Sequence, residues 1–432
     1  MIPILFPSAA FLAVFLVTLR SLGLGFAALF AVGYFNGYIR ANYLSVFTTF
    51  TFDAGVLGLY LGFLVGRPRD LNTVLSGTAG QWVLALIAWP ALLTLVPFND
   101  FLVQLVALRA TVWFLPVMLL ASRLRADDLA VIARGLALLN LVALAGGVYV
   151  YRNGLEALYP QNAVTELMFK SKDVAGFSHH RIPSFFLSAH AYGGAMLFSL
   201  PFLLDRLFGR GVSGLDRCLA LGGVTAAVAG ILLCAARQPV VMFVVVALVA
   251  WVVTRLNVLI GLGAVGLALA ALAVANTHER LQRVKTLEDT EFVSERLRAS
   301  ANESFFELMV NYPIGAGMGS SVGTSIPFFL ADRAPRAIGL ENEYSRILVD
   351  QGLPGLGLWL AFLAWLLHRP PPLRLGTPWG LGVILMYALV VTNWATAFIG
   401  AGTLSSIPGS VLLLTQMGVL CWVREVQNGA RT

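Results

Sequence analysis

Two arginines that border long apolar stretches, Arg181 and Arg237, have the chemistry to hold an anion. Arg181 follows His179 and His180 directly before an apolar run, and Arg237 lies between two apolar runs with no acidic residue near it in sequence. A guanidinium grips phosphate oxygens with paired N–H groups. If the two arginines meet, they could clamp a pyrophosphate and stabilise the charge of a leaving group. For each arginine alone, extension of the side chain toward lipid headgroups is the alternative explanation.

A second group of ionisable residues occupies the run Glu341-Asn342-Glu343-Tyr344-Ser345-Arg346, just before another apolar stretch. A carboxylate that is partly desolvated has a raised pKa and can act as a general base on a hydroxyl group. The alternative is that Glu341 or Glu343 caps the following helix and pairs with Arg346. We favour the base for Glu341 and the structural role for Glu343.

Other kinds of site have no support in the sequence. There is no phosphate-binding GxxxxGK[ST] loop, and the acids and histidines near Arg181 and Glu341 lack metal-ligand spacing. The three cysteines show neither a CxxC motif nor a nearby histidine. We therefore expect no cofactor, no metal and no nucleic-acid partner. The side chains that we expect to contact a substrate, beside the three catalytic candidates, are His180, Tyr192, Asn342, Tyr344 and Arg346.

The elements that must position these residues are membrane helices. Of the 432 residues, 58% are hydrophobic and only 12% are charged, and the mean hydropathy is +0.81. Apolar runs of about 17 to 22 residues recur along the whole chain, and each can cross a bilayer as a helix. The sequence predicts an all-α polytopic bundle of 12 or 13 spans. The candidate spans are residues 3–19, 21–39, 51–66, 79–97, 101–122, 128–150, 185–204, 216–236, 239–254, 256–275, 348–367, 378–397 and 405–423.

The arginines predict how the bundle is oriented. Lys170, Lys172 and Lys285 are the only lysines, so the formal charge of +7 is carried mainly by arginine. Alternate short connections between the predicted spans are rich in arginine, as is the C-terminal end, and the positive-inside rule assigns all of them to the cytoplasm. The two long polar segments, 151–184 and 276–347, then face outward, together with Arg181, Arg237 and Glu341.

The long segments belong to a single transmembrane domain that spans residues 1–432. In the second long segment, apolar residues recur at near-helical spacing among charged residues. They are Phe292, Leu297, Phe305, Leu308 and Met309. This pattern predicts an amphipathic helix along the membrane surface, with packing against the protein as the alternative. Pro313 should end that helix, and the glycines that follow allow tight turns.

The stretch from about residue 175 to 360 resembles the O-antigen ligase and polymerase superfamily of membrane glycosyltransferases. Members show an arginine that enters a span, here Arg181, and an arginine that opens a later span, here Arg237. A long periplasmic loop then carries a turn rich in proline and glycine. The family's most specific motif is a histidine, then Asn, Ser or Gln, then nine residues and GxxG. Asn342 and the glycines 352 and 355 match it, whereas Glu341 occupies the histidine position, as in the polymerase branch.

The resemblance implies a function and a location. The donor would be a glycan on undecaprenyl pyrophosphate, and the acceptor would be a glycan or a lipid, at the periplasmic face of a bacterial inner membrane. Arg181 and Arg237 would hold the pyrophosphate. Glu341 would take the proton of the acceptor hydroxyl, with inversion at the anomeric carbon and without a metal. Membrane lipids and a chain-length regulator would be further partners.

Three alternatives to the polymerase remain open. The polymerase competes with a lipid A-core ligase and with a relative that glycosylates proteins, and Glu341 favours the polymerase. A lipid-linked glycan flippase or another transporter is the alternative from a different class. Transporters place ionisable groups at the bilayer midplane on broken helices, whereas the spans predicted here are nearly free of charge.

Overall fold

The computed structural model describes residues 2–172, 179–209, 211–254, 303–321, 326–334, 342–372, 378–398, 400 and 402–429. Within these ranges every regular element is a helix, apart from one isolated antiparallel bridge between Lys172 and His180. Eight described helices are long and apolar enough to cross a bilayer, and three shorter apolar helices accompany them. The predicted all-α polytopic membrane architecture is therefore confirmed.

The helices follow one another along the chain with short connections, apart from the segments around α10, α16 and η3. Their bounds are α1 Ile2–Arg20, α2 Leu22–Asn42, α3 Val46–Thr49, α4 Thr51–Gly66, α5 Pro68–Ser76, α6 Thr78–Leu93, α7 Phe101–Val112, α8 Val117–Ala121, α9 Ala126–Asn153, η1 Leu155–Ala157, α10 Glu166–Lys170, α11 Ala189–Phe208, α12 Gly214–Leu233, α13 Arg237–Thr254, α16 Glu303–Asn311, η3 Phe328–Arg333, α17 Glu343–Leu367, α18 Gly380–Thr396 and α19 Gly409–Gly429.

Twelve of the thirteen candidate spans coincide with described helices, and the remaining one, 256–275, lies outside the described residues. The break between the first two spans is real, because Ser21 caps α2 by accepting a hydrogen bond from the backbone N–H of Leu24. The span predicted at 101–122 is divided into α7 and α8. Pro116, which lacks an N–H group, lies at the break.

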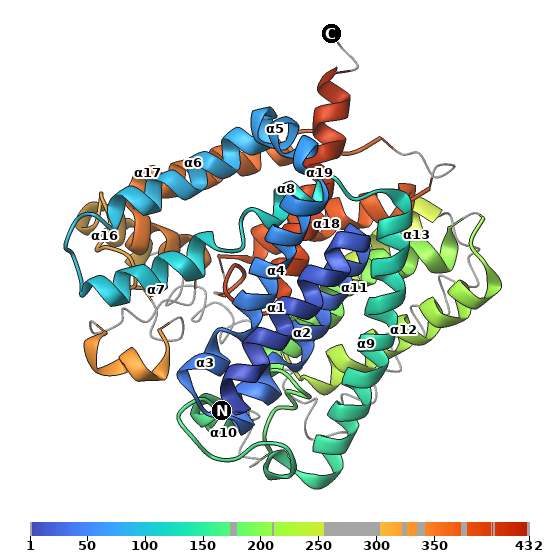
Figure 1. The fold of residues 1–432 in the computed structure, drawn as a ribbon, viewed down its shortest axis with the longest axis horizontal. Helices are drawn as coiled ribbons and strands as arrows, with labels where there is room; N and C mark the ends of the chain where they lie inside the picture. The colour runs from blue at the N-terminus through green and yellow to red at the C-terminus, as the bar shows by residue number, and fades with distance from the viewer. Residues whose placement is uncertain are drawn as a thin grey trace.

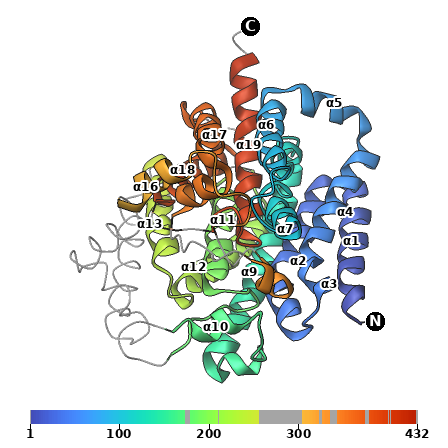
Figure 2. The ribbon, with the colours of Figure 1, turned by 90° about the vertical axis from the view of Figure 1, so that its left-hand side faces the viewer.

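The arginine-rich connections meet at one end of the bundle, which we call the basic end. Trp379, at the start of α18, donates a hydrogen bond to the carbonyl of Ala126 at the start of α9 (2.9 Å). Arg424 of α19 donates to the carbonyl of Arg369 after α17 (2.9 Å). Asp128 of α9 accepts from Ser21 at 3.1 Å. Figures 1 and 2 both show α5 and the C-terminal end of α19 at this end of the molecule.

The opposite end, which we call the loop end, gathers the N-terminus, α3 and α10 (Figures 1 and 2). Asn42, at the end of α2, donates to the carbonyl of Leu158 in the first long segment (2.9 Å). Asn99, before α7, donates to Ser320 in the second long segment (2.8 Å). The described part of the first long segment therefore lies at this end, and that of the second packs against the chain before α7.

The amphipathic helix appears in its described part as α16, which ends at Asn311, two residues before Pro313. Leu308 is buried, and Phe305 and Met309 pack against the main hydrophobic core. Phe306 and Val310 are exposed. The side of α16 that carries Phe305, Leu308 and Met309 thus packs on protein. The rest of the predicted amphipathic helix, directly before Glu303, lies outside the described ranges.

The arrangement predicts which positions a membrane-impermeant thiol reagent can reach in intact cells. Gln161 is exposed at the loop end, and Asn72 is exposed on α5 at the basic end. We expect Gln161→Cys to be labelled from outside and Asn72→Cys only after permeabilisation, both in a background without the native cysteines. A separate variant that keeps Cys218, exposed near the start of α12, as its single cysteine serves as a second inside control. Labelling of Asn72→Cys in intact cells would contradict the assignment.

Candidate functional site at the loop end

Arg181 and Arg237 lie on adjoining segments of the loop end. The Nη1 atom of Arg181 is 2.9 Å from Nε2 of His190 in the first turn of α11. Arg181 also lies within electrostatic range of Cys234, the C-cap residue of α12, and Arg237 begins α13 three residues later. A Cβ atom on Gly193 would lie only 2.6 Å from Sγ of Cys234, so a side chain there would push these helices apart.

The segment before α11 is held in place by a buried tyrosine. The Tyr159 hydroxyl donates to the backbone carbonyls of Ser184 and Phe186, the latter at 3.2 Å. Burial raises the pKa of Tyr159 well above its ordinary value, so the phenol keeps its proton and remains a donor. Ser184 has a positive φ of 52°, which marks a tight turn at the point that Tyr159 holds. Tyr159 thereby positions the chain that carries Arg181.

The turn between α12 and α13 is connected to the start of α17 through the end of α18. Nε2 of Gln238 lies 3.4 Å from Oγ1 of Thr396 in the last turn of α18. The next carbonyl, that of Ala397, accepts a hydrogen bond from the backbone N–H of Glu343 (2.9 Å). The turn that contains Arg237 and the first turn of α17 therefore both contact the C-terminal end of α18.

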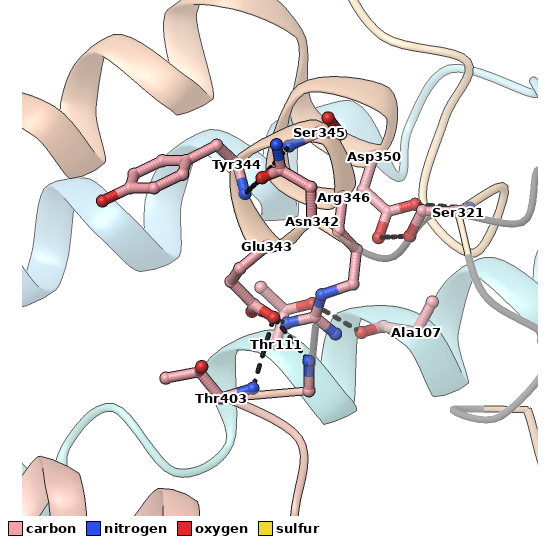
Figure 3. A network of polar contacts seen from close by, with 11 residues as sticks. Ala107, Thr111, Ser321, Asn342, Glu343, Tyr344, Ser345, Arg346, Asp350 and Thr403 are labelled. Carbon is pink, nitrogen blue, oxygen red and sulfur yellow. Dashed lines mark hydrogen bonds and ion pairs between the residues drawn. The ribbon is translucent and has the colours of Figure 1, made fainter. Parts of the chain in front are cut away.

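The Glu343 carboxylate is the centre of a buried polar network (Figure 3). It accepts hydrogen bonds from Arg346 and from the backbone N–H groups of Gly402 (2.7 Å) and Thr403 (3.3 Å). Glu343 is 0% exposed and Arg346 is 9% exposed. The predicted pairing of Glu343 with Arg346 is confirmed. A carboxylate with its oxygens engaged in this way positions the chain rather than taking a proton from a substrate.

A buried half-helix, which we define as residues 343–351 of α17, carries this network. Every residue from 342 to 352 is buried, and Gly352 then breaks the helix with a positive φ of 71°. Near the break, Asp350 accepts hydrogen bonds from the hydroxyl (2.6 Å) and the N–H (3.1 Å) of Ser321. The glycine-rich turn after Pro313 lies beside this break in space, because the backbone N–H of Ala316 donates to the carbonyl of Val349 at 2.7 Å.

Asn342 and Tyr344 have structural roles in this conformation. The Asn342 side chain is the N-cap of α17 and accepts from the N–H groups of Tyr344 (2.8 Å) and Ser345 (3.3 Å). The cap that we considered for a glutamate is thus made by the asparagine. The Tyr344 hydroxyl donates to the carbonyl of Trp394 (2.7 Å), and its ring lies against Phe398. Both residues fix α17 against α18.

The two remaining substrate-contact candidates differ in position. His180 pairs with Lys172 in the isolated bridge and stands edge-on to Phe169, with 5.8 Å between ring centroids, beside Arg181. Tyr192 is 0% exposed and stacks on Phe186 between the helices. The structure therefore places His180 near the arginines and Tyr192 in the packed core, where we no longer expect it to contact a substrate.

The catalytic candidate Glu341 lies outside the described residues, directly before Asn342 in sequence. Of the other site residues, the structure places His180 and Arg181 near the turn that precedes Arg237, and contacts through the end of α18 connect that turn to the start of α17. Within the described ranges, no group of three His, Cys, Asp or Glu side chains is arranged to hold a metal ion.

Sequence reasoning missed an ion pair between spans. Arg109 of α7 and Asp53 of α4 form a two-pronged pair, with Nε 2.6 Å from Oδ1. Our description of the spans as nearly free of charge overlooked it. The sequence does contain a signal for this pair, because Asp53 and Arg109 are oppositely charged and each lies inside a predicted apolar span.

The comparisons with known proteins leave the family as a proposal. No protein-family model matches the sequence, and no curated protein is significantly similar to it.

The Glu343–Arg346 pair should be strongly coupled. Glu343→Gln leaves the Arg346 guanidinium without its closest counter-charge in a buried position, which typically costs about 3–5 kcal/mol. We expect a clear fall in the melting temperature of the purified protein, and a smaller further fall when Arg346→Gln is added. Glu166→Gln, which removes an exposed pair with Lys170, is the matched control and should leave the melting temperature unchanged. A fall in the melting temperature of the double variant that equals the sum of the falls in the two single variants would refute the coupling.

Proposed function

We propose that this protein is a membrane glycosyltransferase that polymerises glycan repeat units carried on a polyisoprenyl pyrophosphate such as undecaprenyl pyrophosphate. The observation that supports the proposal is the position of Arg181 near Cys234, three residues before Arg237, on a turn that contacts the end of α18, which in turn contacts the start of α17. Two guanidiniums at the rim of a membrane bundle suit a diphosphate whose tail stays in the bilayer. Inner-membrane location with the loop end in the periplasm belongs to this proposal.

The reaction that we propose is a displacement at the anomeric carbon of the donor. The acceptor hydroxyl oxygen forms a bond to that carbon while the bond to the phosphate oxygen breaks. The lipid pyrophosphate leaves with the bonding electrons, and Arg181 and Arg237 stabilise its charge. The acceptor proton goes to Glu341, which directly precedes the N-cap of α17. Glu343, already engaged with Arg346 and the 402–403 backbone, serves as a positioning residue.

A transporter is the second candidate, and one observation favours it. The half-helix 343–351 ends in a break at Gly352 and carries buried Glu343, Arg346 and Asp350. Broken helices with buried ionisable groups are typical of transporter binding sites. These groups are already paired with one another or with the backbone and Ser321, which is why the glycosyltransferase is preferred. Transbilayer movement of a labelled lipid pyrophosphate in reconstituted vesicles, without glycan transfer, would favour the transporter.

The glycan profile of cells tests the proposal. We expect Arg181→Ala, Arg237→Ala and Glu341→Gln each to abolish long glycan chains, with single repeats still attached and normal amounts of protein in the membrane. Arg217→Ala is the control, since Arg217 lies at the start of α12 at the basic end and donates to the carbonyl of Gly209. Loss of all attachment would indicate a ligase. Long chains of wild-type abundance in the three variants would refute the glycosyltransferase.

A further inference from the structure

A second basic cluster, unused in the proposed reaction, lies where α2, α4 and α7 meet. Asp53 in the first turn of α4 holds Arg109 by Nε and Nη2, which leaves the Nη1 amino group for another acceptor. The guanidinium carbon of Arg109 also lies 5.1 Å from the centre of the Phe50 ring. Arg109 is therefore fixed on one edge by a carboxylate and on one face by an aromatic ring.

Arg40, in the last turn of α2, adds a second guanidinium to this cluster. It lies within electrostatic range of both Asp53 and Arg109. Among the described residues it forms no ion pair, and its Nε atom is buried without a hydrogen-bond partner. Among the described residues, two guanidiniums thus lie near one carboxylate, and the cluster carries a net positive charge. Such a partly buried excess of positive charge is relieved when an anion binds.

Two buried polar side chains beside the arginines also lack partners in the described part of the chain. Asn36, one turn before Arg40 on the same face of α2, is 2% exposed, and its Oδ1 atom has no hydrogen-bond partner. Thr51, the first residue of α4, is 1% exposed, and its hydroxyl has none. Buried polar atoms are normally satisfied by protein, water or ligand. Asn36 and Thr51 therefore mark this region as one that is completed by something polar.

The surroundings of the cluster are suited to a ligand with a lipid tail. Leu44, Val46 and Phe47, around α3, are 45%, 43% and 51% exposed, and Phe101 at the start of α7 is 60% exposed. Only 17% of the residues in the apolar window of the neighbouring helix α1 are buried, as expected of a helix that faces lipid. On the loop side, Phe329 of η3 packs against Phe50, with 6.4 Å between ring centroids. An amphiphile could place its head at Arg40 and its tail along this apolar rim.

We propose that Arg40 and Arg109 form a second anion site, which binds the diphosphate head of the lipid-linked acceptor, with Asp53 as a positioning residue. This inference rests on the proposed polymerase, whose two substrates both carry a polyisoprenyl diphosphate. Arg181 and Arg237 hold the lipid that leaves, and Arg40 and Arg109 hold the lipid that stays attached to the growing chain. A ligase that transfers to a different kind of acceptor needs no second diphosphate site.

The stoichiometry of lipid binding tests this assignment. The purified full-length protein in nanodiscs of zwitterionic lipid is titrated with radiolabelled polyisoprenyl diphosphate. We expect two equivalents to bind the wild type, one to bind Arg40→Gln, and one to bind the double variant Arg181→Ala/Arg237→Ala. Arg40 is chosen because it forms no ion pair with Asp53, whereas Arg109→Gln would leave a buried carboxylate alone and could unfold the protein. Arg134→Gln, which removes a two-pronged pair with Asp216 at the basic end, is the matched control and should keep two equivalents.

The outcomes separate this inference from the proposed function. One equivalent on the wild type, or two on Arg40→Gln, would overturn the second site. Equal displacement of the label by inorganic diphosphate, or by an anionic phospholipid, would overturn its assignment to the lipid-linked acceptor. If Arg40→Gln loses one equivalent while the Arg181→Ala/Arg237→Ala variant changes neither binding nor glycan length, the second site stands and the proposed function fails.

Discussion

The burial of charge in a low-dielectric bundle is the constraint on which the loop end depends. A charged side chain inside a membrane protein persists only if other charges or hydrogen-bond donors compensate it. The carboxylate of Glu343 meets this condition by binding Arg346 and the backbone N–H groups of Gly402 and Thr403. In doing so it connects α17 to the chain between α18 and α19. The position of Asn342, the N-cap residue of α17, follows from that connection.

The same constraint distinguishes the residues that hold the fold from those that can act on a ligand. Glu343 and Asp350 are engaged by protein groups, so their charges are already compensated. Arg181 and Arg237 lie beside the ends of helices, and Arg40 lies near the single carboxylate that Arg109 binds. Among the described residues, positive charge is thus in excess at the cluster of Arg40 and Arg109, while the carboxylates of Glu343 and Asp350 are engaged in internal contacts. The diphosphate head that we propose as the ligand is complementary to this distribution.

Much of the fold could be predicted from the sequence because local composition determines it. Each apolar run had to become a helix, since the backbone of a membrane span must satisfy its own hydrogen bonds. The pairing of Glu343 with Arg346 could also be predicted, because the two residues are three positions apart on one helix. The Asp53–Arg109 and Asp350–Ser321 contacts join residues 56 and 29 positions apart, and the sequence shows the charges but not their partners. The burial of Tyr192 could not be predicted for a related reason, because a tyrosine next to an arginine motif does not reveal which face of its helix is buried.

The most direct test of the account is an electron cryo-microscopy map of the full-length protein in a lipid nanodisc with a polyisoprenyl diphosphate bound. The account predicts density for a diphosphate between the guanidiniums of Arg181 and Arg237, with the lipid tail passing into the bilayer at the loop end. Diphosphate density at the helix break around Gly352, or at the basic end, with none beside the two arginines, would contradict it.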